Sequence, residues 1–263
     1  MTRAEDVKIS VKFGVSISLF WSGLLGQKGW DMLTRIVELL RAKKVFVRER
    51  TPMEIRALGI LLVYLGLSYR KTEEVLRLFG GGSYEAARQW YHRAKHLLST
   101  PEKKHRPTIA IDETKIKIQG KWHYMWTAID TQTWEILAIQ ITTTRSGLDT
   151  YIFLRKILKT CTNKPHIYVD GDPWYLRNFN SVKIPHDLGN CPKQFPTNPW
   201  ALQRMGLTWE HKTFGPRNPI EQWYHIFKHR IKQFYKRWPH NAKPETTLSW
   251  CLSYITIYNL RRQ

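Results

Sequence analysis

The chain has 263 residues, 42% of them hydrophobic, and its 42 Lys and Arg exceed its 21 Asp and Glu to give a formal net charge of +21. This length and apolar content are enough for a substantial buried core, which excludes a basic disordered tail and indicates one or two folded domains. A folded chain with this much positive charge is expected to bind a polyanion, with nucleic acid as the commonest partner and an anionic membrane surface as the alternative.

The best candidate for a membrane segment is VKFGVSISLFWSGLLG, at 11–26. It is too short to span a bilayer and includes Lys12, and no small-residue cleavage site typical of a signal peptide follows it. We therefore expect a buried element within an N-terminal extension, residues 1–50, of unassigned role, and no membrane association.

Cysteine usage indicates a reducing compartment. Cys161, Cys191 and Cys251 are odd in number and far apart, and their spacing is not that of a metal site. This pattern predicts reduced thiols in a cytoplasmic protein.

Three helices are predicted within residues 51–98. Thr51, Ser68 and Ser83 are suited to cap their N-termini, and the glycines at 80–82 form a tight turn between the second and the third. Two short helices, a glycine turn and a basic third helix are typical of a helix-turn-helix, with an ordinary three-helix bundle that carries a solvated basic face as the alternative.

In a helix-turn-helix the bases would be met by side chains early in the third helix. The expected DNA-contacting residues are Tyr84, Glu85, Arg88 and Gln89. We therefore predict a DNA-binding domain at 51–98.

A mixed α/β domain is predicted at 108–263, after a polar, proline-bearing linker at 99–107. Three β-rich runs separated by turn signals predict an antiparallel meander, and the helical spacing from Leu148 follows it. A short strand then ends at Asp170, another lies near Trp209, and a basic helix opens at Asn218. This order predicts a mixed sheet with flanking helices.

Three acids fall where the predicted elements begin or end. Asp112 and Asp170 close apolar strands, and Glu221 lies at the start of the basic helix. Carboxylates that converge in poorly solvated positions repel one another unless divalent cations neutralise them, and hard ions such as Mg²⁺ bind oxygen ligands. Two such ions can serve both oxygens of an in-line displacement at phosphorus.

Each acid also has a purely structural interpretation. Asp112 suits a turn, Asp170 suits a cap of the DGDPW loop, and Glu221 completes a capping box with Asn218 as N-cap. Three neighbouring acids are less suited to these roles: an alternating strand turns Glu113 to the opposite face, Asp172 precedes a proline, and Asp130 suits a hairpin.

Lys228 follows Glu221 by about two helical turns, so both side chains share one face of the helix. A carboxylate and an ammonium presented together could hold a metal at one end and a DNA phosphate at the other. The alternative is that the offset is chance, because it is too long for a strong ion pair.

The blocks IAIDETKIKIQGKWHYMWTAID, YVDGDPWY and FGPRNPIEQWYHIFKHR together resemble the motifs of DDE transposases with a ribonuclease-H-like integrase core. The chain is most similar to compact transposases of insertion sequence family six, and the resemblance covers about 51–237. It implies an α/β fold in which a ribonuclease-H-like mixed sheet is flanked by helices and preceded by an all-α helix-turn-helix domain.

The resemblance also implies roles for individual residues. The catalytic, metal-binding triad would be Asp112, Asp170 and Glu221, holding two Mg²⁺ ions with Mn²⁺ as a substitute. Lys228 would lie along transposon-end DNA, and phosphate contacts would come from Arg217, Lys228, Arg230 and Lys232. The expected activity is cleavage at terminal inverted repeats and strand transfer into target DNA.

Several expectations about partners accompany this activity. The protein would act on element ends and target DNA as a homodimer or higher assembly on DNA, in the cytoplasm of a prokaryote and near its nucleoid. Two alternatives remain: a structure-specific nuclease or resolvase of the same fold, and a domesticated DNA-binding regulator whose core is only a scaffold.

Overall fold

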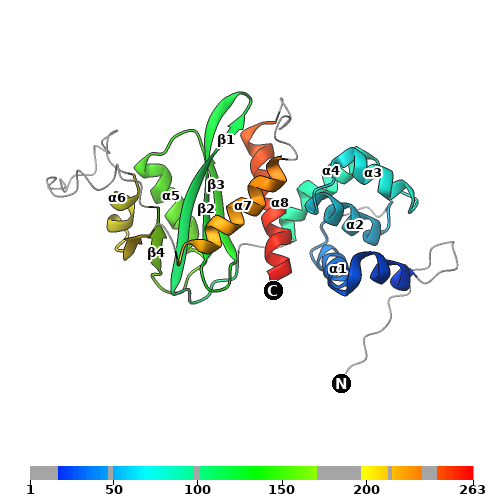
Figure 1. The fold of residues 1–263 in the computed structure, drawn as a ribbon, viewed down its shortest axis with the longest axis horizontal. Helices are drawn as coiled ribbons and strands as arrows, with labels where there is room; N and C mark the ends of the chain where they lie inside the picture. The colour runs from blue at the N-terminus through cyan, green and yellow to red at the C-terminus, as the bar shows by residue number, and fades with distance from the viewer. Residues whose placement is uncertain are drawn as a thin grey trace, which may run out of the picture. The chain divides into compact units, whose positions relative to one another are not determined.

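The computed structural model describes residues 17–46, 50–97, 101–170, 197–212, 215–232 and 242–262, with side chains left undescribed at 17–25, 197–200 and 231–232. The chain divides into two compact units, Met1–Leu97 and Leu98–Gln263 (Figure 1). The division of the sequence into functional domains stays a prediction.

The N-terminal unit is helical. Its helices are α1 (Ile17–Ala42), α2 (Met53–Tyr64), α3 (Tyr69–Arg77) and α4 (Tyr84–Arg93), and a 3-10 turn (Ala94–His96) follows the last of them. The three helices expected within residues 51–98 are therefore present, with α1 as an additional one.

Two of the three predicted helix caps are formed. The Ser68 hydroxyl accepts a hydrogen bond from the Lys71 N–H, and the Ser83 hydroxyl accepts one from the Ala86 N–H, each at 3.2 Å. The prediction for Thr51 was wrong, because Pro52 takes the N-cap position of α2 and no side chain caps that helix.

The turn between α3 and α4 depends on glycine at position 82. Gly82 has φ +105°, and a Cβ added there would lie 2.9 Å from Leu76 Cδ1 and 3.1 Å from the Trp90 ring. A side chain at this position would therefore be strained twice, by the backbone conformation and by the close approach of α3 and α4.

The C-terminal unit is built on a five-stranded sheet with the order β3-β2-β1-β4-β5. Its strands are β1 (Thr108–Ile118), β2 (Lys121–Asp130), β3 (Ile136–Thr142), β4 (His166–Val169) and β5 (Trp209–His211). The first three form the predicted antiparallel meander, while β4 is parallel to β1 and β5 is parallel to β4. The mixed sheet of the ribonuclease-H-like fold class is thus confirmed.

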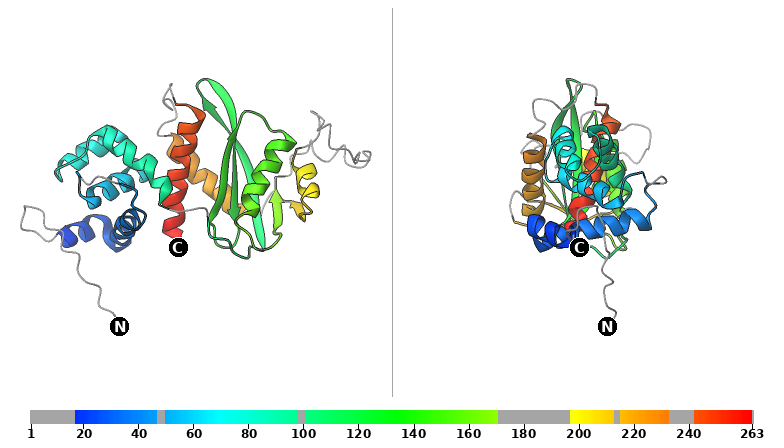
Figure 2. Two further views of the ribbon diagram at one scale, coloured as in Figure 1. Left: turned by 180° about the vertical axis from the view of Figure 1, so that it is seen from behind. Right: turned by 90° about the vertical axis from the view of Figure 1, so that its right-hand side faces the viewer.

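Helices cover both faces of this sheet. On one face lie α5 (Gly147–Leu158) and α6 (Thr197–Arg204), and on the other lie α7 (Asn218–Lys232) and α8 (Pro244–Arg262), as Figure 2 shows from two sides. Trp126 and Phe153 centre the core between the sheet and α5. The sequence did not predict α6 or α8.

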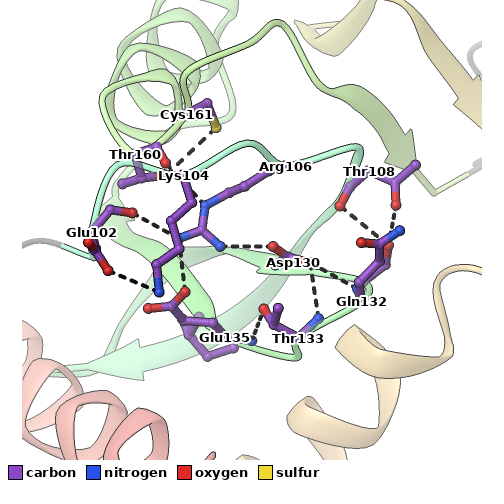
Figure 3. A network of polar contacts seen from close by, with 12 residues as sticks. Glu102, Lys104, Arg106, Thr108, Asp130, Gln132, Thr133, Glu135, Thr160 and Cys161 are labelled. Atoms are coloured by element: carbon purple, nitrogen blue, oxygen red, sulfur yellow. Dashed lines mark hydrogen bonds and ion pairs between the residues drawn. The ribbon is translucent and has the colours of Figure 1, made fainter. Parts of the chain in front are cut away.

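The segment before β1 is fixed to the C-terminal unit by Arg106 (Figure 3). The guanidinium is 1% exposed and lies 2.8 Å from both the Asp130 and the Glu135 carboxylates. It also donates hydrogen bonds to the backbone oxygens of Thr160 and Glu102, each at 3.1 Å. The predicted linker therefore ends in a buried anchor, because Arg106 meets two acids far from it in sequence.

Candidate active site

The sheet brings the first two acids of the predicted triad side by side. β1 and β4 are parallel neighbours whose register pairs Ala110 with Tyr168. Continuing that register by two residues places Asp112 beside Asp170, on adjacent strands about 4.8 Å apart. Asp112 lies within β1, and Asp170 follows directly after the last residue of β4.

The third acid, Glu221, comes from α7 and meets the other two at one cation. Arg217 Nη2 lies 3.2 Å from Asp112 Oδ2, while Nη1 lies 2.9 Å from Asp170 Oδ1 and 3.8 Å from Glu221 Oε1. The Arg217 side chain is only 2% exposed, whereas the side chains of Asp170 and Glu221 are 56% and 43% exposed. Three carboxylates far apart in sequence therefore converge on a single guanidinium.

The start of α7 differs from the predicted capping box. Asn218 is the first helical residue, and its side-chain oxygen accepts a hydrogen bond from the Gly215 N–H at 3.1 Å. Glu221 reaches toward the guanidinium of Arg217, four residues before it. The capping interpretation of Glu221 was therefore wrong, because Asn218 is bonded to the preceding turn.

Tyr224 fixes α7 against the sheet beside the acids. Its hydroxyl lies 2.9 Å from the backbone oxygen of Asp112 and 3.2 Å from that of Met125, both within donating distance. Trp223 and Phe227 are buried on the same helix, with stacked rings 4.8 Å apart. Tyr224, which follows Glu221 by about one helical turn, was not among the residues expected at the site.

Burial sets the electrostatics of Asp112. Desolvation raises the pKa of its carboxyl to about 7, against the opposing charge of Arg217 and with a further upward contribution from Glu113. A carboxylate in this setting is stabilised by any additional cation nearby. One guanidinium supplies a single positive charge to three acids, so the donor set suits hard divalent ions.

The three carboxylates do not form a complete metal-binding site in this conformation. Within the described ranges, no three Asp, Glu, His or Cys side chains lie close enough together to hold an ion as they stand. Arg217 bonds to all three acids, so ions could enter between them only if the guanidinium moved aside. The predicted phosphate contact of Arg217 likewise requires it to leave the carboxylates.

Two of the three neighbouring acids, Glu113 and Asp130, make contacts away from the site. Glu113 faces the other side of the sheet, where it pairs with Arg145, as strand alternation predicts. Asp130 is a hairpin residue, because its carboxylate accepts hydrogen bonds from the Gln132 and Thr133 N–H groups. Asp172 lies outside the described residues.

The other residues of α7 that were predicted to contact DNA differ in their exposure to solvent. The Lys228 side chain is exposed, and its Nζ lies 5.4 Å from the centroid of the Tyr224 ring. Arg230 is partly buried, and the side chain of Lys232 lies outside the described residues.

On α4, the predicted base-contacting side chains surround Glu85. Its carboxylate accepts two hydrogen bonds from Arg88, at 2.8 and 2.6 Å, and one from Gln89 at 3.0 Å. These bonds lower the pKa of Glu85 to about 2, so that it stays charged at any ordinary pH. Tyr84 is 49% exposed at the first position of the helix. Glu85 thus orients Arg88 and Gln89.

The mixed sheet, with two aspartates and a glutamate that meet at Arg217, is the arrangement expected from the resemblance to DDE transposases. A family model described as a DDE domain matches residues 107–199. An uncharacterised protein of Methanocaldococcus jannaschii is 41% identical over 224 residues, which are 85% of this chain and 94% of that protein. The transposase for the insertion sequence-like element IS431mec of Staphylococcus aureus is 33% identical over 122 residues, 44% of this chain and 54% of the transposase.

The chain is therefore similar to DDE transposases of the kind that its motifs resemble, those of insertion sequence family six. Among solved structures, the catalytic core of HTLV-2 integrase in complex with magnesium is similar over 57% of this chain and 85% of that chain, with 12% identity and a TM-score of 0.37. The described part of the chain contains no helix long and apolar enough to cross a membrane.

Proposed function

We propose that this protein cleaves the ends of an insertion sequence and joins them to target DNA, with Asp112, Asp170 and Glu221 as ligands of two Mg²⁺ ions. The match to a DDE domain and the similarity to the transposase of an insertion sequence-like element support the proposal. When bound, such ions supply Lewis acidity that activates an attacking hydroxyl and stabilises charge at phosphorus. Mn²⁺ is an expected substitute.

The chemistry is an exchange of phosphodiester bonds. Water first releases a 3′-hydroxyl at the element end, and that oxygen then attacks a target phosphorus while the bond to the target's own 3′-oxygen breaks. The proton of the attacking hydroxyl is balanced by one taken up at the leaving oxygen. No reductant or nucleoside triphosphate is needed, so the task of the protein is positioning and electrostatics.

Other residues of the chain would bind the DNA. Tyr84, Arg88 and Gln89 on α4 would contact the terminal inverted repeat, as the second and third helices of a helix-turn-helix allow. Lys228, Arg230 and Lys232 would contact phosphates near the acids, and such contacts predict a steep loss of affinity with salt. Two ends joined to one target require at least a dimer on DNA.

The observation that carries the proposal is the convergence of the three acids on Arg217. The acids come from β1, the end of β4 and α7, and all three face one buried cation, an arrangement that would offer three carboxylates to divalent ions once the guanidinium had moved aside.

The test is a joining assay with labelled duplexes that carry the DNA bordering this gene and end in an exposed 3′-hydroxyl. They are incubated with target plasmid and Mg²⁺, and the wild type is compared with Asp112→Asn, Asp170→Asn and Glu221→Gln. We expect joined products from the wild type and a loss of at least about a thousandfold in each variant. Glu113→Gln is the matched control, because that acid faces the other side of the sheet.

Three outcomes would contradict the proposal. Nicking of branched DNA without joining would indicate a structure-specific nuclease or resolvase. Binding without metal-dependent chemistry would indicate a DNA-binding regulator. Equal activity in all variants would show that the acids are structural.

A further inference from the structure

The hairpin formed by β1 and β2 extends beyond the rest of the sheet (Figure 1). β4 pairs with β1 only over 108–110, and β3 pairs with β2 only over 124–129, whereas β1 and β2 stay paired to Ile118 and Lys121. The distal part of the hairpin is therefore a two-stranded ribbon, and each strand has one edge without a strand beside it.

The two faces of this ribbon differ sharply. Ile118 and His123 are buried on the face that Asp112 shares, so that face is covered. The opposite face carries exposed Lys115, Lys117 and Trp122, and Trp122 is 61% exposed. An exposed tryptophan on a ribbon with a covered back is available to a partner, because no packing within the described chain needs its outer surface.

On this face each lysine of β1 lies directly opposite an aromatic residue of β2. The register pairs Lys117 with Trp122 and Lys115 with Tyr124. Lys117 Nζ lies 5.7 Å from the centroid of the Trp122 ring, and Lys115 Nζ lies 6.0 Å from that of Tyr124. Arg145 lies over the same tyrosine, at 5.6 Å. We call these five residues the hairpin stripe.

The charge of the stripe selects an anionic partner. Four acids do not neutralise the two lysines of the stripe. Glu113 pairs with Arg145, and the three acids of the site lie on the opposite face of the sheet, where they pair with Arg217. Cations that track a backbone, interleaved with exposed rings on which bases stack, are the features of surfaces that bind unpaired nucleic acid.

The position of the stripe relative to the acids suits the same DNA. Lys115 and Lys117 follow Asp112 by three and five residues on one strand. At about 3.3 Å per residue, they lie about 10 to 17 Å from it along β1, a distance that a few nucleotides can span. The stripe and the acids lie on opposite faces of β1, so a DNA strand whose end is at the acids would reach the stripe around the edge of β1 that β4 leaves free beyond residue 110.

We propose that the hairpin stripe binds unpaired nucleotides of the DNA on which the site acts, with a base stacked on Trp122 and phosphates bound by Lys115 and Lys117. This inference rests on the proposed function and adds a substrate feature to it: a few melted nucleotides near the element end. Duplex bases are already stacked on one another, so the exposed ring favours an unstacked base.

The test compares two labelled DNAs of the same terminal sequence by fluorescence anisotropy, one a blunt duplex and the other carrying five unpaired nucleotides. We expect the wild type to bind the partly unpaired DNA more tightly, and Trp122→Ala to lose about tenfold in affinity for that DNA alone. Trp122→Phe, which keeps a ring, should retain most of the preference. Because Trp122 is exposed, neither variant should change the unfolding temperature appreciably.

A second pair of variants tests the phosphate contacts. Lys115→Gln combined with Lys117→Gln should reduce the slope of log affinity against log salt by about 1.4 for the unpaired segment. Lys103→Gln combined with Lys159→Gln removes the same charge from exposed positions elsewhere and should reduce it by less.

The outcomes separate this inference from the proposed function. If the wild type binds neither DNA, both are overturned. If it binds and joins DNA but Trp122→Ala binds both DNAs as the wild type does, only the stripe is overturned. A changed oligomeric mass in Trp122→Ala with unchanged DNA binding would also overturn it, because the stripe would then be a contact between copies of the chain.

Discussion

Arg217 Nη2 lies 3.2 Å from the Asp112 carboxylate, on a side chain that is almost completely buried. The same guanidinium bonds to Asp170 at 2.9 Å, so one cation links the middle of β1 to the end of the parallel strand β4 at the proposed site. An arginine cannot lose its proton to relieve crowding, and it must move as a whole if divalent ions are to take its place.

Replacing Arg217 by methionine should destabilise the protein by about 3 kcal/mol in buffer without divalent ions, because it leaves the carboxylates without their buried counter-charge. This loss lies at the lower end of the range of about 3–5 kcal/mol for breaking a buried ion pair, because the side chains of Asp170 and Glu221 are partly exposed to solvent. Added Mg²⁺ should then raise the unfolding temperature of Arg217→Met more than that of the wild type, since ions no longer compete with the guanidinium. Thermal unfolding with and without MgCl₂ measures both effects.

Arg230→Met is the control for this experiment, because it removes an arginine from the same helix and leaves the acids paired. The opposite result would be that Mg²⁺ raises the unfolding temperature of Arg217→Met by no more than that of the wild type. This result would mean that the guanidinium does not occupy the position where the ions bind.

Tyr224→Phe should weaken Mg²⁺ binding while leaving the acids themselves intact. The lost hydroxyl is the contact between α7 and the backbone of Asp112, so Glu221 would be held less firmly relative to β1. The stability loss should be modest, about 1 kcal/mol, as expected for one hydrogen bond. Calorimetric titration with Mg²⁺ checks the effect, and an unchanged affinity would reduce Tyr224 to a packing residue.

The sequence predicted the five strands, α5 and α7 of the C-terminal unit because strand alternation, helical spacing and turn residues are local signals. The three acids were found because Asp112 and Asp170 each end an apolar run and Glu221 lies near the start of a helix, although Asp112 proves to lie within β1 and not at its end. Their convergence could not be read from spacing, since it depends on the β1–β4 register. Arg217 was expected to face DNA because a sequence shows that a residue is basic and does not show which acids it meets.

Two further omissions have physical causes. Helix α8 is buried at every position from Ser253 to Leu260, so it has no polar face to give a helical period. Arg106 belongs to a polar, basic segment, and its acid partners lie 24 and 29 residues away. Long-range pairing of this kind leaves no local trace in the sequence.

Arg106→Met should be among the most damaging substitutions in the C-terminal unit. It leaves Asp130 buried without its cation, and breaking one side of a buried ion pair costs about 3–5 kcal/mol. Denaturant unfolding of the full chain measures the loss. Lys104→Met is the control, because Lys104 pairs with the exposed Glu102 and should cost less than about 1 kcal/mol. Similar losses in both variants would contradict the role of burial.

Gly82→Ala should destabilise the helical unit more than Gly80→Ala does. Both positions have positive φ, +105° and +85°, but only at position 82 would the new methyl group meet Leu76, at 2.9 Å. We expect about 1 kcal/mol from backbone strain at Gly80 and about 2–3 kcal/mol at Gly82, where overpacking adds to strain. Equal effects in thermal unfolding would mean that the turn relaxes and that close packing of α3 and α4 is not required.

The helical unit should lose stability in mild acid through His92. Burial, with help from the positive charges of Arg88 and Lys95, lowers the pKa of His92 from 6.5 to about 4. Between those values the unfolded chain binds more protons than the folded one, so stability is complete above about pH 6.5 and falls as the pH drops toward 4. His92→Gln cannot titrate, and the difference in unfolding free energy between the wild type and this variant should fall by about 2 kcal/mol across that interval. A difference that stays constant with pH would show that His92 titrates normally in the folded chain.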